Sequence, residues 1–522
     1  MMIALICACS FSGAVLAQSA ADVVIPRPNE VTVLQGRVTI DGSISIVEDN
    51  ASSEAKYLKN ELKSRFGLSV KGSANKAISI KVDESSNLPE EGYTLKVNDS
   101  GASIVSSTQK GAFYGIQTLL QLFRAGHEGS TITLDNQEIC DEPRFSWRSF
   151  MLDECRYFLG QEELYKILDG MAELKMNTLH WHLTDDAGWR VEIKQYPLLT
   201  KIGGKRADSE IGTWGSGKTS GEPHEGFYTQ KQIKEVLAYA KQRHIKVIPE
   251  IEMPGHASAA IAAYPWLGTK GDTIDVPVQF GKLYHTFDVL NPDVVEFLQN
   301  VIVEVIELFD TDVIHIGGDE VRFDHWEESE KYQKYKSDKG FDSFMDIQID
   351  FTNNMSKFVE KQGCKMMGWN EILGNVLHAD IKSANASTKV ADNVIVQFWK
   401  GDPIMLAEAA EQGYTLVNSY HVFTYLDYTY KSISLEKAYS FEPVSDGVDD
   451  KYSDNIIGLG CQLWREWLAT PELVQRNVFP RIAAYAEVGW SDKSNKDYES
   501  FTKRLQPVVS GWQSKGINVY VP

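Results

Sequence analysis

The sequence predicts an α/β protein in which a closed (β/α)₈ barrel follows a smaller α+β domain. From about residue 144 onward, short apolar segments alternate with amphipathic ones eight times. Most of the apolar segments end in polar or aromatic residues, as the strands of a catalytic barrel do. The earlier part of the chain mixes strand-like and helical patterns. We place the α+β domain at residues 22–141 and the barrel at residues 143–522.

The α+β domain is predicted from changes in hydrophobic period. Residues 38–47 alternate between isoleucine and polar side chains, which indicates a strand. Residues 53–66 and 110–123 carry apolar side chains at helical spacing. Residues 77–82 and 93–97 are further strand-like segments. Strands with interspersed helices favour an α+β module.

Each barrel unit is predicted from an apolar segment and the amphipathic segment that follows it. The predicted strands are residues 149–153, 178–183, 246–251, 312–316, 365–369, 394–399, 415–418 and 456–464. The predicted helices between and after them are residues 161–174, 230–243, 294–309, 344–361, 403–411 and 471–486. The domain is longer than the ~250 residues that are usual for this fold, so it requires insertions. Residues 200–227 and 425–453 are the predicted insertions.

Composition and charge are typical of a globular protein and argue against a nucleic-acid partner. The chain is 43% hydrophobic and 24% charged, which is typical of a globular rather than a disordered protein. Its formal net charge of −20 argues against a nucleic-acid partner, because phosphate binding needs clustered Lys and Arg. Beyond the first twenty residues, no segment is apolar for the roughly 20 residues that a membrane span needs.

Residues 1–20 are predicted to be a signal peptide. Residues 1–17 carry no charged side chain, and the apolar stretch ends in Ala17-Gln18-Ser19-Ala20, as at a cleavage site. The absence of Lys or Arg near Met1 departs from the usual pattern. Cys9 lies too close to the start for the leader that a lipoprotein anchor requires. We therefore expect export to a periplasmic, secreted or lysosome-like compartment.

Four cysteines follow the predicted leader: Cys140, Cys155, Cys364 and Cys461. An exported protein can pair such residues in disulfides. Their spacing contains no CxxC motif, which argues against a zinc site built from them. The sequence leaves open how they pair, and whether the protein is a monomer or a homodimer.

Carboxylates and indoles recur where the predicted strands end. The groups are Asp153-Glu154, Asp185-Asp186, Glu250 with His256, Asp319-Glu320, Trp369-Asn370-Glu371, Trp399-Lys400, Tyr420-His421 and Trp464-Arg465-Glu466. The carboxyl ends of barrel strands meet at one face, and active sites of this fold lie there. A ring of acids and flat aromatic faces indicates a hydrolase acting on a neutral sugar.

Asp319 and Glu320 are the candidate catalytic residues. Most glycosidases place two carboxyl groups on opposite sides of the scissile bond, roughly 5–10 Å apart. Sequence neighbours are poorly placed for that arrangement. They fit a reaction in which the carbonyl oxygen of a 2-acetamido group attacks C1 to form an oxazolinium intermediate. Glu320 would be the general acid and then the base, and Asp319 would accept the acetamide N–H.

The segment His315-Ile316-Gly317-Gly318-Asp319-Glu320 resembles the His-x-Gly-Gly-Asp-Glu signature of glycoside hydrolase family 20, the β-N-acetylhexosaminidases. Residues 147–153, 180–190 and 249–256 resemble the first three barrel strands of that family. The N-terminal module resembles the α+β domain that precedes the barrel there. The resemblance covers nearly the whole chain after the leader, in the order of the family.

The resemblance implies roles for residues that bind the sugar ring. Arg148 would bind the hydroxyls at C3 and C4, and Glu466 would share the C4 region. Asp427 would hold the outer hydroxyls. Asp185 and His256 would support the sugar and Glu320.

It also implies which residues receive the acetamide group. Trp369, Trp399 and Trp464 would form the wall around its methyl group. Tyr425 would donate a hydrogen bond to its carbonyl and direct the oxygen towards C1. No metal and no cofactor is implied.

These observations predict an exo-acting β-N-acetylhexosaminidase that removes terminal β-linked GlcNAc with retention. The choice between GlcNAc and GalNAc stays open, and so does the natural oligosaccharide or glycoconjugate. A non-catalytic N-acetylhexosamine-binding protein on the same fold is the alternative, although both acids are present. A chitinase of another barrel family would carry an Asp-x-x-Asp-x-Asp-x-Glu segment, which this sequence lacks.

A metal centre is a further alternative. His180 and His182 lie on one face of a predicted strand, near Asp185, Asp186 and His256 in the sequence. Zinc prefers about four such ligands. The surrounding indoles do not suit a hydrated metal ion, so the sugar site is the preferred interpretation.

Overall fold

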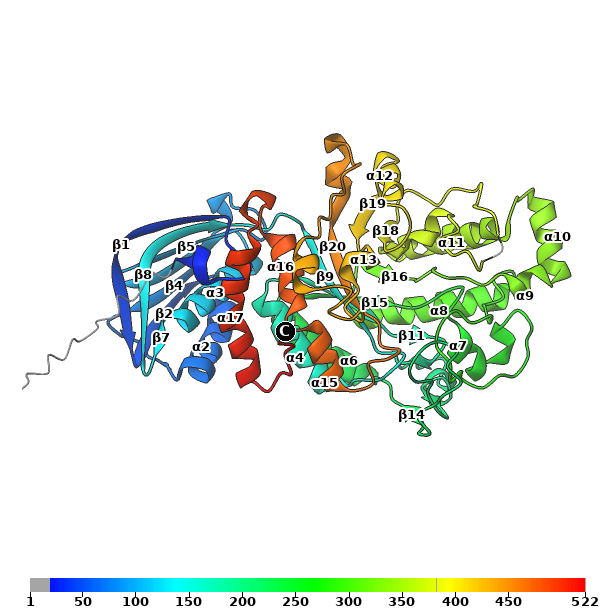
Figure 1. Ribbon diagram of the computed structural model, residues 1–522, viewed down its shortest axis with the longest axis horizontal. Coiled ribbons are helices and arrows are strands. Elements are labelled where there is room, and N and C mark those ends of the chain that lie inside the picture. The colour runs from blue at the N-terminus through cyan, green and yellow to red at the C-terminus, as the bar shows by residue number, and fades with distance from the viewer. Residues whose placement is uncertain (1–18, 382, 522) are drawn as a thin grey trace, which may run out of the picture. The chain divides into compact units, whose positions relative to one another are not determined.

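The computed structural model describes residues 19–381 and 383–521. The chain divides into two compact units, with the boundary between Asp141 and Glu142 (Figure 1). Of the predicted signal peptide, only Ser19 and Ala20 are described, and residues 1–18, including Cys9, lie outside the described residues. Among the described residues, no helix has the length and apolar character needed to cross a bilayer.

The first unit is one mixed sheet with helices packed on it, an α+β module. Its sheet has the order β1-β8-β5-β6-β4-β2-β3, with β7 paired to β8. The strands are β1 (Glu30–Asp41), β2 (Ser43–Asp49), β3 (Ser69–Val70), β4 (Ala77–Val82), β5 (Tyr93–Asn98), β6 (Gly101–Ser106), β7 (His127–Glu128) and β8 (Thr131–Asp141). The helices are α1 (Ala20–Val23), α2 (Ser52–Phe66), η1 (Glu84–Ser86) and α3 (Gln109–Gly126).

The single strand predicted at residues 38–47 is two strands. Gly42 has a φ of +62° and turns the chain between β1 and β2. β1 then pairs with β8 in antiparallel fashion, while β2 pairs with β4 in parallel. Alternation continues through this turn, so only the glycine signals the break.

The second unit is a closed barrel of eight parallel strands, which confirms the predicted fold class. The strands are β9 (Trp147–Asp153), β10 (Thr178–His182), β15 (Lys246–Glu250), β16 (Val313–His315), β17 (Lys365–Trp369), β18 (Ile395–Phe398), β19 (Thr415–Asn418) and β20 (Ile456–Leu463). Each lies within or beside its predicted segment.

Helices follow the strands and surround the barrel. The longer ones are α4 (Gln161–Glu173), α6 (Gln230–Lys241), α8 (Pro292–Phe309), α11 (Phe344–Lys361), α12 (Ile404–Glu411), α15 (Pro471–Val478), α16 (Arg481–Trp490) and α17 (Tyr498–Ser514). The helix predicted at residues 471–486 is therefore two helices, α15 and α16. They are separated at Phe479-Pro480, where proline removes a backbone donor.

The segments after the strands carry the remaining elements. These are β11 (Thr184–Asp185), β12 (Gly188–Trp189), α5 (Leu198–Lys201), β13 (Lys205–Arg206), β14 (His224–Glu225), α7 (Ser258–Ala263), η2 (Pro265–Leu267), α9 (Asp324–Glu327), α10 (Glu330–Lys339), η3 (Asn370–Leu373), α13 (His421–Thr424), α14 (Leu435–Tyr439), η4 (Asp450–Asn455) and η5 (Lys493–Asn495). The predicted insertion at residues 425–453 contains α14 and follows the seventh strand. A long segment at residues 251–291, which is not one of the predicted insertions, follows β15.

The barrel interior changes from apolar to polar along the strands. An apolar cluster contains Ile248, Val313 and Met367, together with residues of other strands. Two residues further along the same strands lie Glu250, His315 and Trp369, which are also buried. Because side chains two apart share a face of a strand, these polar groups form the next inward layer. The site is built on this layer.

Candidate active site

The turn after β16 is possible only because of its glycines. Gly317 and Gly318 have φ values of +67° and +89°, and Glu320 itself has a φ of +51°. A Cβ on Gly317 would lie 1.7 Å from Oε2 of Glu252, so no larger residue fits there. The glycines bring the backbone close to the buried Glu252 carboxyl and place Asp319 and Glu320 at the mouth of the barrel.

Asp319 is a buried acid with an unoccupied acceptor. Its Oδ1 has no hydrogen-bond partner among the described residues, and its Oδ2 lies 3.8 Å from Nε2 of His256. Burial raises the pKa of Asp319 to about 7; the charge on His256 opposes this shift, and the carboxyl groups of Glu371 and Glu320 add to it. A buried acceptor of this kind is suited to a ligand N–H.

Glu320 lies beside Asp319 but is more accessible, with 20% of its side chain exposed. Two histidines flank its carboxyl group. Nε2 of His378 is 3.2 Å from Oε1, and Nε2 of His256 is 3.8 Å from Oε2. The group is therefore open to the pocket, with an imidazole ring on either side of it.

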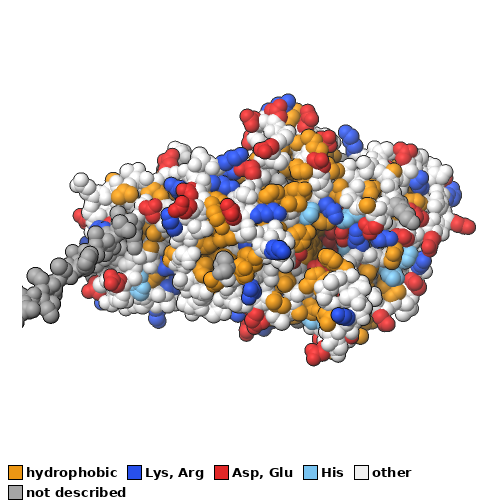
Figure 2. Space-filling model, viewed as in Figure 1, with side chains coloured by type: hydrophobic (Ala, Val, Ile, Leu, Met, Phe, Trp, Pro, Cys, Tyr) orange, Lys and Arg blue, Asp and Glu red, His pale blue; other side chains and the backbone are white. Residues whose placement is uncertain are grey.

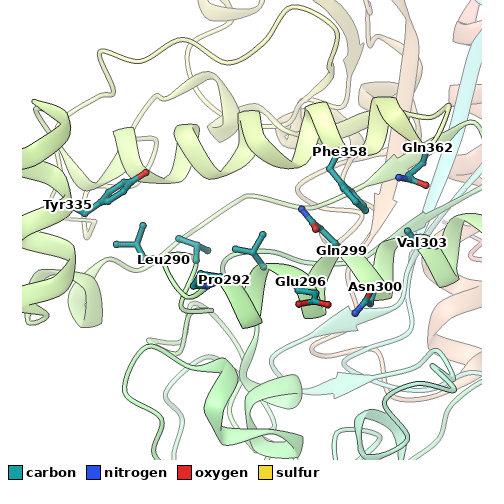
Figure 3. Close-up of a pocket in the computed structure, with 11 residues that line it drawn as sticks. Leu290, Pro292, Glu296, Gln299, Asn300, Val303, Tyr335, Phe358 and Gln362 are labelled. Carbon is teal, nitrogen blue, oxygen red and sulfur yellow. The ribbon is translucent and has the colours of Figure 1, made fainter.

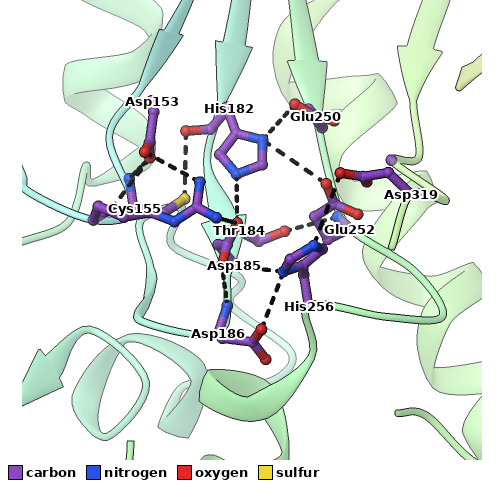
Figure 4. A network of polar contacts seen from close by, with 12 residues as sticks. Asp153, Cys155, His182, Thr184, Asp185, Asp186, Glu250, Glu252, His256 and Asp319 are labelled. Atoms are coloured by element: carbon purple, nitrogen blue, oxygen red, sulfur yellow. Dashed lines mark hydrogen bonds and ion pairs between the residues drawn. The ribbon is translucent and has the colours of Figure 1, made fainter. Parts of the chain in front are cut away.

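His256 is held by two carboxylates below the pocket (Figure 4). Its Nδ1 lies 3.1 Å from Asp186 and 3.5 Å from Asp185. Burial works against protonation of His256, but these carboxylates raise its pKa well above the usual value. His256 lines the pocket, whereas Asp185 lies beneath it and pairs with His182, His256 and Arg156. Asp185 therefore lies where it can support His256 and Arg156, and it is not among the residues that line the pocket.

Glu250 anchors the polar layer under the pocket. Its carboxyl group bonds His182, lies 2.9 Å from both His180 and His315, and accepts a 2.8 Å hydrogen bond from Nε1 of Trp369. Burial alone would raise the pKa of Glu250, but the histidines hold it well below the usual value. His180 thus belongs to the barrel interior with His315, apart from the group formed by His256, Asp185 and Asp186. Of the histidines named for a metal centre, His180 and His256 thus fall in different groups, and His182 lies between them, in contact with both Glu250 and Asp185.

Aromatic rings form the wall of the pocket. Trp399, Tyr425 and Trp464 line it, and the Trp399 and Tyr425 rings are parallel within 5° at 5.9 Å. Trp369 packs behind them, 6.4 Å from Trp399 and 5.8 Å from Trp464. It is buried and points its N–H at Glu250, so it supports the wall and is not among the residues that line the pocket. Nε1 of Trp399 donates to Glu371 at 2.9 Å.

The residues that line the pocket include one arginine and two acids of interest, Arg156, Asp427 and Glu466. The Arg156 guanidinium lies 2.9 Å from Asp185 and 3.2 Å from Asp153, and it covers the ring of Trp464. Burial raises the pKa of Asp427 well above its usual value, and the neighbouring Glu466 adds to this shift. Burial also raises the pKa of Glu466, but the charge on Arg156 opposes that shift. Oδ1 of Asp427 has no partner among the described residues.

Arg148 is not part of this site, which corrects its predicted role. It lies near the beginning of β9, at the opposite end of the strand from the pocket. Its Nε donates to the carbonyl of Lys175 and its Nη1 to that of Phe145, and its guanidinium packs on Trp490. Of these two arginines, only Arg156, which follows the end of β9, lines the pocket. The position after the strand, rather than near its beginning, is the signal that distinguishes the two arginines.

The sequence analysis also missed several charged residues near Glu320. Lys282, Arg322, His378 and Asp380 line the pocket, together with the strand-end residue Lys400. Lys282 pairs with Asp380 at 2.7 Å. Lys282, Arg322, His378 and Asp380 come from irregular segments, so no periodic pattern could have revealed them.

The pocket has a volume of about 510 Å³ and opens on the face shown in Figure 2, where acidic side chains and histidines surround a hollow. A second groove of about 720 Å³ lies beside α8 and α11 (Figure 3). Glu296 is the one acid among the residues that line it. The chemistry of the molecule is therefore concentrated in the first pocket.

The four cysteines that follow the leader are distributed over both units, with Cys140 in the first and the others in the second. Cys155, Cys364 and Cys461 are buried in the barrel unit and carry free thiols. The thiols of Cys155 and Cys364 donate to the backbone carbonyls of His182 and Thr311. Burial raises the pKa of Cys155 to about 12, so this thiol stays protonated at neutral pH.

Comparison with known proteins identifies the family of the chain. Residues 145–493 match the glycosyl hydrolase family 20 catalytic domain, and residues 22–142 match domain 2 of that family. The chain belongs to glycosyl hydrolase family 20. A β-hexosaminidase of Porphyromonas gingivalis is 34% identical over 96% of the chain, which spans 64% of that relative's length. A β-hexosaminidase of Vibrio furnissii is 33% identical over 90% of the chain and 76% of the relative.

Solved structures of family 20 proteins share this fold. An exo-β-N-acetylglucosaminidase of Vibrio harveyi, in complex with N-acetylglucosamine, has a TM-score of 0.83 and 30% identity, over 96% of this chain and 79% of that one. An N-acetyl-β-hexosaminidase of Streptomyces plicatus has a TM-score of 0.80 and 29% identity, over 96% of both chains. The two-domain architecture of the family is thus shared over nearly the whole chain.

Proposed function

We propose that this protein is an exo-acting β-N-acetylhexosaminidase that removes terminal β-linked GlcNAc with retention of configuration. The observation that carries the proposal is the adjacency of Asp319 and Glu320 in an aromatic-walled pocket, with Oδ1 of Asp319 unpaired. The named activities of the Porphyromonas, Vibrio and Streptomyces relatives support the same conclusion.

The reaction begins with the substrate's own acetamide group. Its carbonyl oxygen attacks C1 while the bond from C1 to the leaving oxygen breaks, and Glu320 gives its proton to that oxygen. Asp319 accepts the acetamide N–H and stabilises the positive charge that develops on the forming oxazolinium ring. Tyr425 directs the carbonyl oxygen, and Trp399 and Trp464 enclose the methyl group.

In the second step, Glu320 removes a proton from water as the water oxygen attacks C1. The bond from C1 to the acetamide oxygen breaks, and the acetamide is restored. Two displacements at C1 give overall retention. The same carboxyl group gives and takes one proton, so the site is ready for another cycle.

Binding of the terminal sugar is assigned to the group of Arg156, Asp427 and Glu466. A guanidinium and two carboxyl groups can bond several hydroxyls of one ring. Charged groups that close this part of the pocket favour a chain end over an internal sugar. GalNAc differs at C4, so its acceptance depends on this same group.

The decisive experiment compares hydrolysis of 4-nitrophenyl β-GlcNAc, β-GalNAc and β-chitobioside. An exo-acting enzyme releases 4-nitrophenol directly from the monosaccharides, but it must first remove the outer sugar of the chitobioside. Glu320→Gln should lower turnover of chitobiose by about 100-fold or more, because a general acid typically contributes that much. A wild-type protein that binds GlcNAc without hydrolysing any of these substrates would instead be the non-catalytic binding protein.

We also propose export, on the basis of the uncharged apolar residues 1–17 and the small residues that follow. N-terminal sequencing of the protein from its native host should give a mature end close to Ser19. A mature protein that retains Met1 would contradict export by this signal.

A further inference from the structure

We propose that the enzyme prefers substrates whose aglycone, the part that leaves, is a sugar with a carboxylate or sulfate group, and that Lys282 and Lys400 bind this acidic group. The inference rests on the proposed function, because it names the aglycone that the same pocket accepts. It goes beyond that function, which assigns residues only to the terminal sugar and its acetamide.

The two lysines lie on the side of the pocket where the aglycone begins. Nδ1 of His378 is 3.2 Å from Nζ of Lys282 and 3.1 Å from Nζ of Lys400. The other nitrogen of this ring, Nε2, lies 3.2 Å from Oε1 of Glu320. In the proposed reaction Glu320 gives its proton to the leaving oxygen, so the aglycone starts beside this carboxyl group. One imidazole ring therefore separates the ammonium groups from that point.

Described carboxylates neutralise these cations only in part. Asp380 pairs with Lys282 at 2.7 Å and with Arg322 at 3.4 Å, so two cations share it. Lys400 lines the pocket and donates to His378, but it forms no ion pair with a carboxylate of the described residues. An ammonium group has three N–H donors, so two remain on Lys400 after the bond to His378.

The charge on Lys400 is costly in the absence of a ligand. Burial lowers the pKa of Lys400, the charge of Lys282 adds to this shift, and Glu320 opposes it. A carboxylate or sulfate bound between the two ammonium groups would supply the missing counter-charge. It would also accept the unused N–H donors in charge-assisted hydrogen bonds, which are stronger than neutral ones.

The local charge is opposite in sign to that of the whole chain. The formal net charge is −20, and the pocket is also lined by Asp427 and Glu466. Physiological salt screens repulsion between exposed charges beyond about 8 Å, so the groups that the aglycone contacts decide whether an acidic one is accepted. On the aglycone side these groups include Lys282, Arg322 and Lys400.

An exposed indole beside the same segment favours a sugar as the carrier of the acidic group. Trp214 lines the pocket, and 60% of the residue is exposed. A Cβ on Gly281, which directly precedes Lys282, would lie 3.3 Å from Cδ1 of Trp214. A large apolar ring that stays exposed at a pocket is suited to packing against a ligand, and its flat face matches the apolar face of a sugar ring. The occupant that fits both features is a sugar acid.

The first experiment measures kcat/KM for two pairs of disaccharides through the release of GlcNAc. One pair is GlcNAc β1,4-linked to methyl glucuronide and to methyl glucoside. The other is GlcNAc β1,3-linked to methyl galactoside with and without a 6-sulfate. We expect the acidic member of at least one pair to be cleaved about tenfold more efficiently, because the neutral member lacks the charge-assisted hydrogen bonds. The pair that shows the preference distinguishes a carboxylate from a sulfate.

Added salt tests whether charge causes the preference. At 0.5 M NaCl the ratio of kcat/KM between the acidic and neutral members should fall, because salt weakens the attraction of an anion to partly exposed cations. A ratio that does not respond to salt would contradict an ionic origin.

Three substitutions should change this ratio in opposite directions. Lys282→Gln and Lys400→Gln keep an N–H donor but remove a positive charge, so each should lower the ratio by about threefold or more. Asp380→Asn removes the carboxylate that competes for Lys282, so it should raise the ratio. Any effect of Lys400 on Glu320 itself acts on both members of a pair and cancels in the ratio. A merely structural role would not give changes of opposite sign.

Lys270→Gln is the matched control. Lys270 lies in the same segment after β15 as Lys282, but it pairs with Glu328 at 2.9 Å and is not among the residues that line the pocket. Its substitution should leave the ratio unchanged.

Equal kcat/KM within both pairs for the wild type, or a preference that persists in Lys282→Gln/Lys400→Gln, would overturn this inference. Hydrolysis of 4-nitrophenyl β-GlcNAc would then still support the proposed function. A wild type that is inactive on that substrate and on all four disaccharides would overturn both.

Discussion

The carboxyl group of Glu252 occupies the space beside Gly317 in which any other residue would carry its Cβ. Burial raises the pKa of Glu252 well above its usual value, and Asp319 and Glu250 add to the shift. Burial therefore favours the neutral form of this acid, which packs against the turn that carries Asp319 and Glu320. The position of both catalytic candidates depends on this close approach.

Gly317→Ala should consequently impair both folding and catalysis. A methyl group 1.7 Å from Oε2 of Glu252 forces the turn to move, and overpacking of this kind typically costs about 1–3 kcal/mol. We expect a lower unfolding midpoint and a large loss of kcat in the fraction that folds. The control is Gly413→Ala: this glycine has a φ of +88° and open space around it, so only the backbone cost of about 1 kcal/mol applies. Similar activity in the two variants would contradict the argument.

Arg148 and Arg156 should respond differently to the same substitution. Arg156→Lys removes a forked donor from the pocket, so KM for 4-nitrophenyl β-GlcNAc should rise by about tenfold or more. Arg148→Lys leaves the carbonyls of Lys175 and Phe145 with poorer donors, so it should lower the unfolding midpoint and spare KM. Steady-state kinetics and thermal unfolding of both variants check this. The opposite pattern would restore the role that the sequence assigned to Arg148.

These two arginines illustrate which features the sequence predicts and which it does not. The eight strands were predictable because buried parallel strands are short apolar segments, and Asp319 and Glu320 because two glycines at a strand end have a steric purpose. The motif around Arg148 gives that residue the wrong role, because the motif alone does not state at which end of β9 the arginine lies. His378 and Lys282 could not be found, because tertiary folding alone brings these irregular segments to Glu320.

The charge of His256 should set the pH dependence of the reaction. Asp319 has a pKa of about 7, which would be higher without the opposing charge of His256. Since Asp319 must be ionised to stabilise the oxazolinium charge, kcat/KM should fall as the pH drops through about 7. In His256→Gln the positive charge is lost, so the acid limb should move to higher pH. The pH profile of kcat/KM is measured on 4-nitrophenyl β-GlcNAc. If its acid limb is unchanged in His256→Gln, then a group other than Asp319 produces that limb.

The 2-acetamido group should be indispensable in the substrate. The unpaired Oδ1 of Asp319 and the rings of Trp399, Tyr425 and Trp464 are assigned to that group and to no other part of the sugar. A β-glucoside presents a hydroxyl there, so the intramolecular nucleophile is absent and its advantage of many orders of magnitude is lost. We expect kcat/KM for 4-nitrophenyl β-glucoside to be lower than that for the GlcNAc substrate by about 1,000-fold or more. A thiazoline analogue of the oxazoline should bind far more tightly than GlcNAc itself, because it resembles the intermediate. Measurable turnover of the glucoside together with weak thiazoline inhibition would instead require a nucleophile from the protein, and the adjacency of Asp319 and Glu320 would then need another explanation.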